Sequence, residues 1–212
     1  MKNYQLYLFD FDYTLAKSED AIVKCFYHVF DTNGYTGITR EQITATIGML
    51  LTDAFELLTG VHDKDVIESY RCQFVEKANS CMTEMTELYP EVLPAFERIK
   101  AAGGRIGIVS SKQRFRILET VAKYHLEDTI DLVLGCAEVE RAKPDPQGIL
   151  IALDEMKVSK EECIYVGDHV FDAKAAKNAG VDFAGVTQGQ TSYEKLAEYP
   201  HAIIMENLSK LC

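Results

Sequence analysis

Short apolar segments alternate with helical patterns over most of this chain of 212 residues. The segments predicted as strands cover residues 5–9, 105–109, 131–134, 163–166 and 183–186. Each segment is rich in aliphatic or aromatic residues and is too short for a helix, which is typical of buried strands. Strands that are separated by helices form a parallel sheet with helices on both faces. The sequence therefore predicts an α/β fold built around a parallel sheet.

A block of helical pattern interrupts this alternation directly after the first predicted strand. Its helices are predicted to begin near four polar residues: Ser18, Thr39, Thr52 and Asp63. Ser18 is an expected N-cap, and Thr39 is expected to form a capping box with Gln42. The block contains no strand pattern, so it is predicted to be all-helical. We therefore expect residues 1–15 and 86–212 to form a discontinuous α/β core and residues 16–85 to form an inserted helical domain.

Composition argues against two classes of protein. The formal net charge of −11 opposes binding to a nucleic-acid backbone, and no apolar run approaches the ~20 residues that a membrane helix needs. The start of the chain shows no signal-peptide pattern. The six cysteines lie far apart without a C-x-x-C pair, which favours reduced, structural thiols. We therefore expect a cytoplasmic monomer or homodimer with no nucleic-acid or membrane partner.

Polar side chains follow the predicted strands at the points where the strands end. Asp10 and Asp12 follow the first strand, and because alternate residues of an extended chain point the same way, both carboxylates are expected to face one pocket. The later strands lead to Ser110, to the loop that contains Lys143, and to Asp168 with Asp172. A single Asp at a strand end is also an ordinary turn residue. The carboxyl ends of parallel strands meet at one sheet edge, however, so the four stretches together predict one polar site there.

This predicted site holds more carboxylates than its lysine can neutralise. Two like charges ~4 Å apart repel by ~4 kcal/mol at an effective dielectric constant of ~20. Clustered carboxylates therefore need a cation, and hard oxygen ligands around an open site suit Mg²⁺. Phosphoryl transfer through an aspartyl phosphate uses four groups: a carboxylate nucleophile, a fixed lysine, Mg²⁺ and a second acid.

Four stretches resemble, in the right order, the motifs of the haloacid dehalogenase-like hydrolase superfamily. They are Asp-Phe-Asp-Tyr-Thr-Leu from Asp10, Ile-Val-Ser-Ser-Lys ending at Lys112, Ala-Lys-Pro-Asp-Pro around Lys143, and the stretch from Gly167 to Asp172. The resemblance covers essentially the whole chain. It implies a Rossmann-like core, an inserted helical cap that closes over the active site, Mg²⁺ as cofactor and a small phosphate ester as substrate.

The resemblance also implies a role for each candidate residue. Asp10 resembles the nucleophile and Asp12 the general acid/base, and Lys143 is counted with them among the catalytic residues because it holds phosphate. The implied metal site consists of Asp10, the backbone carbonyl of Asp12, Asp168 and, supporting them from behind, Asp172. The predicted substrate-binding set is Phe11, Ser110, Ser111, Lys112 and Lys143.

Differences from other members of the superfamily narrow the predicted activity. A dehalogenase expels halide, which needs neither a proton nor a metal, so Asp12 and the metal site would be superfluous. A phosphonatase would be expected to carry a Schiff-base lysine in its cap, and no lysine of the helical block has that context. Leu51 stands where β-phosphoglucomutases carry an arginine, and the stretch around it resembles the cap loop of phosphoglycolate phosphatases and related pyrophosphatases. We therefore expect a phosphatase for a small phosphomonoester such as phosphoglycolate. Inorganic pyrophosphatase, phosphomutase and a regulatory binding protein on the same fold are the alternatives.

Four positions leave the exact substrate open. Tyr13 replaces the glycine that is usual in the first motif, and Ser111 replaces an asparagine of the second. His169 stands where a small polar residue is common, so it is expected either to touch substrate or to form a local hydrogen bond. Lys112 is expected either to contact an anionic leaving group or to be solvated.

Overall fold

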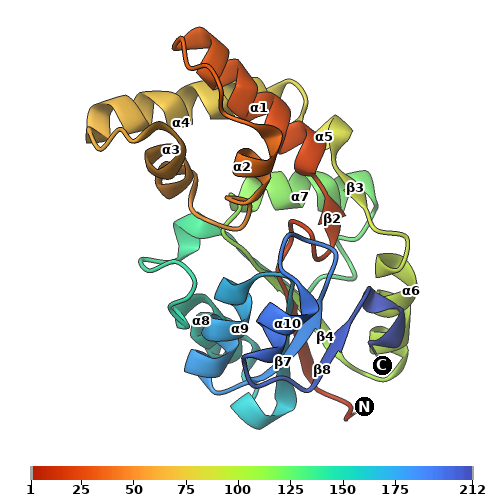
Figure 1. Cartoon of the computed structure of the whole chain (residues 1–212). Coiled ribbons are helices and arrows are strands. Elements are labelled where there is room, and N and C mark those ends of the chain that lie inside the picture. The colour runs from red at the N-terminus through yellow and green to blue at the C-terminus, as the bar shows by residue number, and fades with distance from the viewer. Residues whose placement is uncertain (1, 212) are drawn as a thin grey trace.

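A six-stranded parallel sheet lies at the centre of the computed structural model, which describes residues 2–211 (Figure 1). The strands follow the order β5 (Leu132–Leu134), β4 (Arg105–Val109), β1 (Leu6–Phe9), β6 (Cys163–Gly167), β7 (Asp182–Val186) and β8 (Ile203–Met205). Every neighbouring pair runs parallel, which confirms the predicted α/β fold. The predicted strands do not include β8, an edge strand of three residues of which only Met205 is buried.

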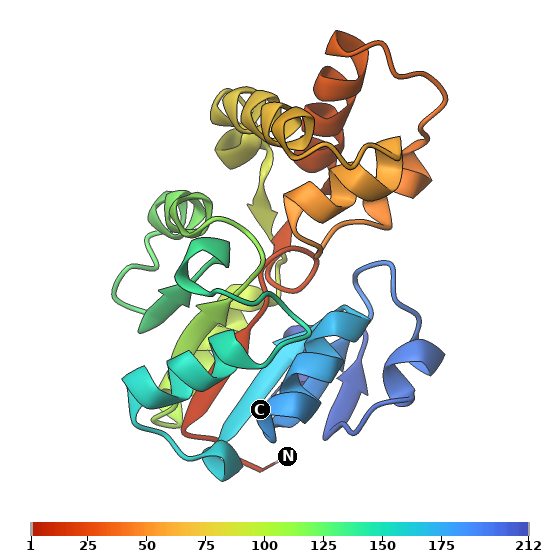
Figure 2. The same ribbon diagram turned by 90° about the vertical axis from the view of Figure 1, so that its left-hand side faces the viewer.

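Helices cover both faces of this sheet (Figure 2). On one face lie α6 (Val92–Ala101) and α7 (Arg114–Lys123), and on the other lie α8 (Gln147–Met156) and α9 (Val170–Ala179). Alternate residues of β1 therefore enter different cores, with Phe9 packing among residues of α6 and α7 and Leu8 among residues of α8 and α9. A strand buried on both faces is apolar throughout. The part of the chain around this sheet also contains four short helices: α10 (Tyr193–Ala197), η1 (Cys136–Glu138), η2 (Lys160–Glu162) and η3 (Leu208–Lys210).

A separate group of helices lies beyond the carboxyl ends of the strands (Figures 1 and 2). It consists of α1 (Glu19–Thr32), α2 (Arg40–Thr44), α3 (Leu51–Thr59), α4 (Lys64–Asn79) and α5 (Met82–Met85). These helices share a hydrophobic core of their own, in which the Phe55 ring contacts the rings of Phe26 and Phe74. The group, called the helical unit below, therefore packs around its own apolar side chains.

Two features at the entrance to the helical unit differ from the sequence prediction. A short antiparallel pair, β2 (Ala16–Lys17) with β3 (Glu87–Leu88), connects the unit to the core, so the segment after the first strand is not wholly helical. Ser18 precedes α1 as expected, but its side chain does not cap the helix and instead donates a hydrogen bond to Asp12. A two-residue strand is too short to leave a sequence pattern, and the Ser18 contact depends on how the chain folds back.

The cysteines within residues 2–211 are free thiols, and Cys212 lies outside the described residues. Cys25 and Cys81 approach each other to 3.8 Å between their Sγ atoms inside the helical unit. Burial raises the pKa of the Cys25 thiol to about 12. None of the helices formed by residues 2–211 has the length and apolar character required to cross a membrane.

Candidate active site

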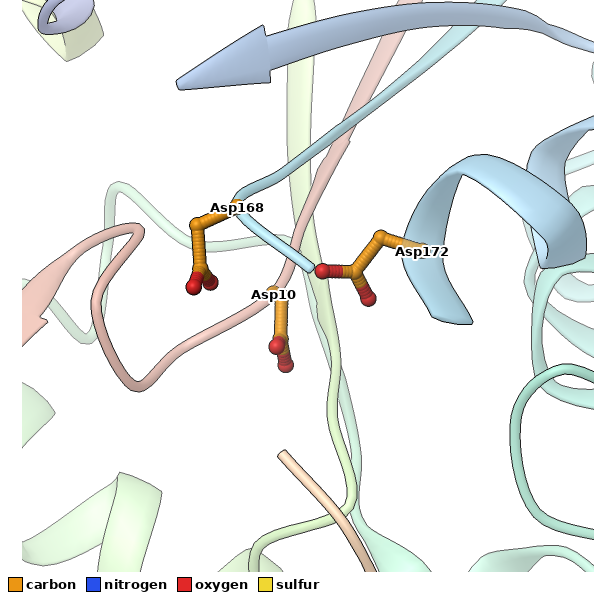
Figure 3. A group of neighbouring side chains, drawn as sticks. All are labelled: Asp10, Asp168 and Asp172. Atoms are coloured by element: carbon orange, nitrogen blue, oxygen red, sulfur yellow. The ribbon is translucent and has the colours of Figure 1, made fainter. Parts of the chain in front are cut away.

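Three buried carboxylates converge at the carboxyl ends of two central strands (Figure 3). Asp10 follows β1, Asp168 follows β6, and Asp172 lies in the first turn of α9. Each offers an oxygen within 4.8 Å of the others. Because β1 and β6 are neighbours in the sheet, side chains 158 residues apart in the sequence meet at one point. The sequence-predicted convergence of Asp10 with Asp168 is therefore present in the fold.

Lys143 places a single ammonium group among these carboxylates. Its Nζ lies 3.0 Å from Oδ1 of Asp10 and 2.7 Å from Oδ1 of Asp172, and it donates a hydrogen bond to the Tyr165 hydroxyl at 3.2 Å. Burial alone would lower the pKa of Lys143, but the charges of Asp10 and Asp172 raise it well above its ordinary value. The lysine is therefore held in its charged form.

One lysine does not neutralise the cluster of three carboxylates. Burial raises the pKa of Asp168 well above its ordinary value, and the nearby carboxylates of Asp172 and Asp10 raise it further. Burial also raises the pKa of Asp10, an effect that Lys143 opposes. Both shifts mean that the ionised cluster is unstable without additional positive charge.

The same cluster has the features expected of a divalent-cation site. Among residues 2–211, the buried Oδ1 of Asp10 accepts no hydrogen bond, and the Lys143 ammonium group 3.0 Å away is shared with Asp172. A buried carboxylate oxygen without a hydrogen bond is costly unless enough positive charge lies beside it. Carboxylate oxygens are the ligands that Mg²⁺ prefers. The residues present therefore fit a magnesium ion.

Asp12 lies outside this acidic cluster and has its own partners. Its Oδ1 is 2.9 Å from Nζ of Lys112 and also accepts a hydrogen bond from the Ser18 hydroxyl. The side chains of Asp12 and Lys112 are only 12% and 9% exposed, so the ion pair is largely shielded from solvent. Lys112 is thus neither solvated nor free, and it holds the second carboxylate of the first motif in position.

The other predicted substrate-binding residues occupy different places. Ser110 and Ser111 line the same cavity as Asp10, and the Ser110 hydroxyl accepts a hydrogen bond from the backbone N–H of Lys112. The Phe11 side chain, by contrast, is buried in the core and does not line the cavity. Phe11 can therefore meet a ligand only through its backbone.

Several site residues are absent from the sequence prediction. Thr14 donates a hydrogen bond to Oδ1 of Asp168 at 3.1 Å, and the Tyr165 hydroxyl donates to the carbonyl of Val109 at 2.7 Å while accepting from Lys143. Gly189 lies so close to Asp168 that a Cβ at this position would be 2.0 Å from Oδ2. A threonine and a strand tyrosine carry no periodic signal, whereas a glycine shortly after a predicted strand does indicate a close approach.

Two of the positions that depart from the family pattern make local contacts. Tyr13 has a φ angle of 58° and donates a hydrogen bond to Glu19, which ties the first motif to the start of α1. His169 is the N-cap of α9, where Nδ1 accepts from the N–H of Phe171 at 3.1 Å. Burial lowers the pKa of His169, which favours the neutral ring that this cap requires. The local hydrogen bond expected for His169 is therefore present.

A cavity of about 200 Å³ lies between the helical unit and the core. On the core side it is lined by Asp10, Asp12, Ser110, Ser111 and Lys112. On the other side lie residues of the helical unit, including Leu51, whose side chain provides no donor there. The space is open to the acidic cluster through Asp10, so a molecule in the cavity would reach the proposed nucleophile.

Comparisons with known proteins identify the family to which this chain is similar. The family model described as haloacid dehalogenase-like hydrolase matches residues 7–186. A relative named pyrophosphatase PpaX from Anoxybacillus flavithermus is 32% identical over 209 residues, which span 99% of this chain and 95% of that protein. PpaX of Listeria monocytogenes is 31% identical over 205 residues, covering 96% of this chain and 93% of its own.

Solved structures agree with this assignment. A crystal structure from Bacteroides fragilis, of a protein named as a haloacid dehalogenase-like hydrolase, has a TM-score of 0.96 and 44% identity over 99% of this chain and 100% of its own. A Lactobacillus plantarum structure, of a protein named as a phosphoglycolate phosphatase, has a TM-score of 0.86 and 24% identity over 99% of this chain and 98% of its own. At that lower identity the likeness concerns the fold.

Proposed function

The chain belongs to the haloacid dehalogenase-like hydrolase family and is a phosphoric ester hydrolase, and on that premise we propose that it is a Mg²⁺-dependent phosphatase for a small phosphomonoester. The observation that carries the proposal is the buried cluster of Asp10, Asp168 and Asp172 with Lys143 at its side. The carboxylates attract a cation, and the cation together with Lys143 would then attract a phosphate. It sits at the end of a cavity that has room for a leaving group.

In the proposed reaction, a carboxylate oxygen of Asp10 attacks the phosphorus atom and forms an aspartyl phosphate. The bond from phosphorus to the ester oxygen breaks, and Asp12 donates a proton to the leaving oxygen. Asp12 then removes a proton from water, which attacks the aspartyl phosphate and regenerates Asp10 with release of phosphate. Lys143 and the Ser110 hydroxyl offer a charge and a hydrogen bond to the phosphate oxygens.

The metal would be held by Asp10 and Asp168, with Asp172 orienting Lys143 behind them. When bound, Mg²⁺ would offset the repulsion between the carboxylates and a phosphate dianion. Thr14 keeps the Asp168 carboxylate in place through its hydroxyl, and Gly189 leaves room for it. These contacts hold the side chains before any ligand arrives, which lowers the cost of ordering them.

We take residues 16–85 to be the cap that closes the site and residues 1–15 with 86–212 to be the catalytic core. Two contacts support a seated position of the cap. Gly48, with a φ angle of 102°, lies near His169, since a Cβ at this position would be 3.7 Å from Cγ of the His169 ring. On the other side, Arg116 of α7 donates hydrogen bonds to Asn79 and to the carbonyl of Val75 in α4. Closure of such a unit excludes water from the reaction.

Pyrophosphate hydrolysis is the second candidate, because two relatives that match almost the whole chain are named pyrophosphatase PpaX. The cavity favours a phosphomonoester with a hydrocarbon leaving group, since apolar side chains such as Ile22, Leu51 and Phe74 form much of its wall. A mutase is disfavoured by Leu51, which offers no charge to the far end of a hexose phosphate.

A Mg²⁺-supplemented screen of phosphate esters tests the proposed function. We expect hydrolysis of p-nitrophenyl phosphate and of small anionic phosphomonoesters such as phosphoglycolate, with hexose phosphates poor and interconversion of hexose phosphates absent. Released phosphate is the measurement. Strong selectivity for pyrophosphate would promote the second candidate, and efficient exchange between hexose 1- and 6-phosphates would contradict the assignment.

Replacing Asp12 by asparagine should separate the two halves of the reaction. Attack on p-nitrophenyl phosphate needs little protonation of its leaving group, but hydrolysis of the aspartyl phosphate needs a base. Steady-state turnover should fall by roughly 10²- to 10⁴-fold, the usual contribution of general acid–base catalysis. Rapid mixing should show a burst of p-nitrophenol and accumulation of phosphorylated protein.

The exposed Asp20 provides a matched control, because Asp20→Asn makes the same change on the surface of α1. This control variant should turn over normally without a burst. Wild-type steady-state turnover in Asp12→Asn would rule out the acid–base role of this carboxylate.

A further inference from the structure

The walls of the cavity contain more apolar surface than phosphate chemistry needs. In the proposed reaction, phosphate and metal would occupy only its core side, at Asp10 and Ser110. The remainder is lined mainly by apolar side chains of the cap and its loop: Ile22, Phe26, Ile47, Leu50, Leu51 and Phe74. A site for one water needs only about 10–15 Å³, so a cavity of about 200 Å³ has space for a leaving group of several atoms. This wall would contact a leaving group through its hydrocarbon part.

Three cationic side chains also line the cavity within the described part of the chain: Arg71, Lys112 and Arg116. Two of them are fully committed to protein partners. Lys112 is paired with Asp12. Arg116 is 7% exposed and donates to Glu119, to Asn79 and to a backbone carbonyl of α4. Neither cation can turn toward a ligand without leaving a buried partner unpaired, which would be costly.

Arg71 is held by a much weaker arrangement. It projects from α4, and its guanidinium donates to both carboxylate oxygens of Glu68 at 2.7 and 2.6 Å. The two side chains are 31% and 54% exposed and lie three residues apart on one helix. Although this pair is bidentate, solvent screens it, and exposed pairs on neighbouring turns of one helix contribute little free energy. An anion in the cavity can therefore take over the Arg71 guanidinium at small cost.

We propose that Arg71 is a specificity-determining residue that binds a second anionic group at the far end of the substrate. The inference rests on the proposed phosphatase function. It assigns the substrate to phosphomonoesters whose leaving group has a short hydrocarbon body and ends in a carboxylate or a second phosphate. The guanidinium fork matches the paired oxygens of either group, and the apolar wall contacts the carbons between the two ends.

A homologous series of compounds tests this assignment. The probes are phosphate monoesters of ω-hydroxycarboxylic acids with two to five carbons, alkyl phosphates of the same lengths, and the corresponding alkanediol bisphosphates. The wild-type protein should prefer doubly anionic compounds to alkyl phosphates. Arg71→Gln should raise KM for the doubly anionic compounds by roughly ten- to hundredfold, the usual effect of losing a charge-assisted hydrogen bond. KM for the alkyl phosphates and kcat should stay within about twofold, because these compounds have no second anionic group for Arg71 to bind.

Two companion variants separate ligand binding from a structural role. If the Arg71–Glu68 pair merely stabilises α4, Glu68→Gln must have the same effect as Arg71→Gln. If Arg71 binds the substrate, Glu68→Gln releases the guanidinium and should leave KM for the doubly anionic compounds unchanged or lower it. Arg71→Lys should recover part of the selectivity, since it keeps the charge but loses the fork. Lys64→Gln, at the exposed start of the same helix, should change nothing.

The outcomes distinguish this inference from the function on which it rests. A larger KM effect in the carboxylate arm identifies a carboxylate as the second group, and a larger effect in the bisphosphate arm identifies phosphate. An equal loss of kcat/KM for doubly anionic and alkyl compounds in Arg71→Gln would overturn the role of Arg71 while leaving the phosphatase intact. Absence of any Mg²⁺-dependent hydrolysis by the wild-type protein would overturn the proposed function and this inference with it.

Discussion

Replacing Asp10 by asparagine should reduce phosphate release to background, a loss of roughly 10³-fold or more, because an amide cannot form the aspartyl phosphate. The substitution keeps the shape of the side chain and removes one of three clustered carboxylates. Lys143 retains Asp172 as its partner at 2.7 Å, so no buried ammonium group is left unpaired. The fold should therefore persist, and the loss of activity should reflect chemistry alone. Steady-state hydrolysis of p-nitrophenyl phosphate with Mg²⁺ is the measurement.

A matched surface change controls for the removal of a negative charge. Asp154 is 83% exposed and, among residues 2–211, its ion pair is with Lys157, directly after the end of α8, so Asp154→Asn should retain full activity. Thermal unfolding should show that Asp10→Asn is at least as stable as the wild-type protein, since it relieves repulsion within the cluster. Near-native kcat in a folded Asp10→Asn protein would refute the covalent mechanism.

Removal of divalent cations should abolish turnover to a similar extent. Without a cation, the ionised forms of Asp10 and Asp168 repel an incoming phosphate, and the raised pKa of Asp168 shows how poorly the cluster tolerates its own charge. Excess chelator should therefore bring the hydrolysis of p-nitrophenyl phosphate to background, and added Mg²⁺ should restore it. Full turnover in the presence of chelator would exclude the magnesium site.

Metal binding can also be followed without any substrate. A cation that binds only the folded protein stabilises it by about 2.7 kcal/mol at a concentration 100 times its Kd. Added Mg²⁺ should therefore raise Tm of the wild-type protein, and the shift should shrink in Asp168→Asn, which lacks one proposed ligand. An unchanged shift in Asp168→Asn would place the cation elsewhere.

The sequence alone was sufficient to predict which side chains meet in the candidate active site. Asp10, Lys143 and Asp168 follow or lie between recognisable strands, and their convergence needs only a parallel sheet with β1 next to β6. Parallel strands end at one edge whatever the details of side-chain packing. The α/β fold class and the helical character of the inserted segment could also be predicted, because the periodicity of strands and helices is visible in the local sequence. The strands β2 and β3 were not predicted because two residues are too few for a periodic pattern. The edge strand β8 was not predicted either.

What the tertiary structure decided is which charges are available to a substrate. In the sequence, Lys112 is the prominent cation beside the second motif, and Arg71 is an unremarkable residue of an amphipathic helix. In the fold, Lys112 forms a shielded ion pair with Asp12, whereas Arg71 lines the cavity and is paired with the exposed Glu68. These outcomes depend on how the helical unit sits on the core. That position is set by long-range packing and by contacts such as those of Arg116 with α4, which local sequence patterns do not encode.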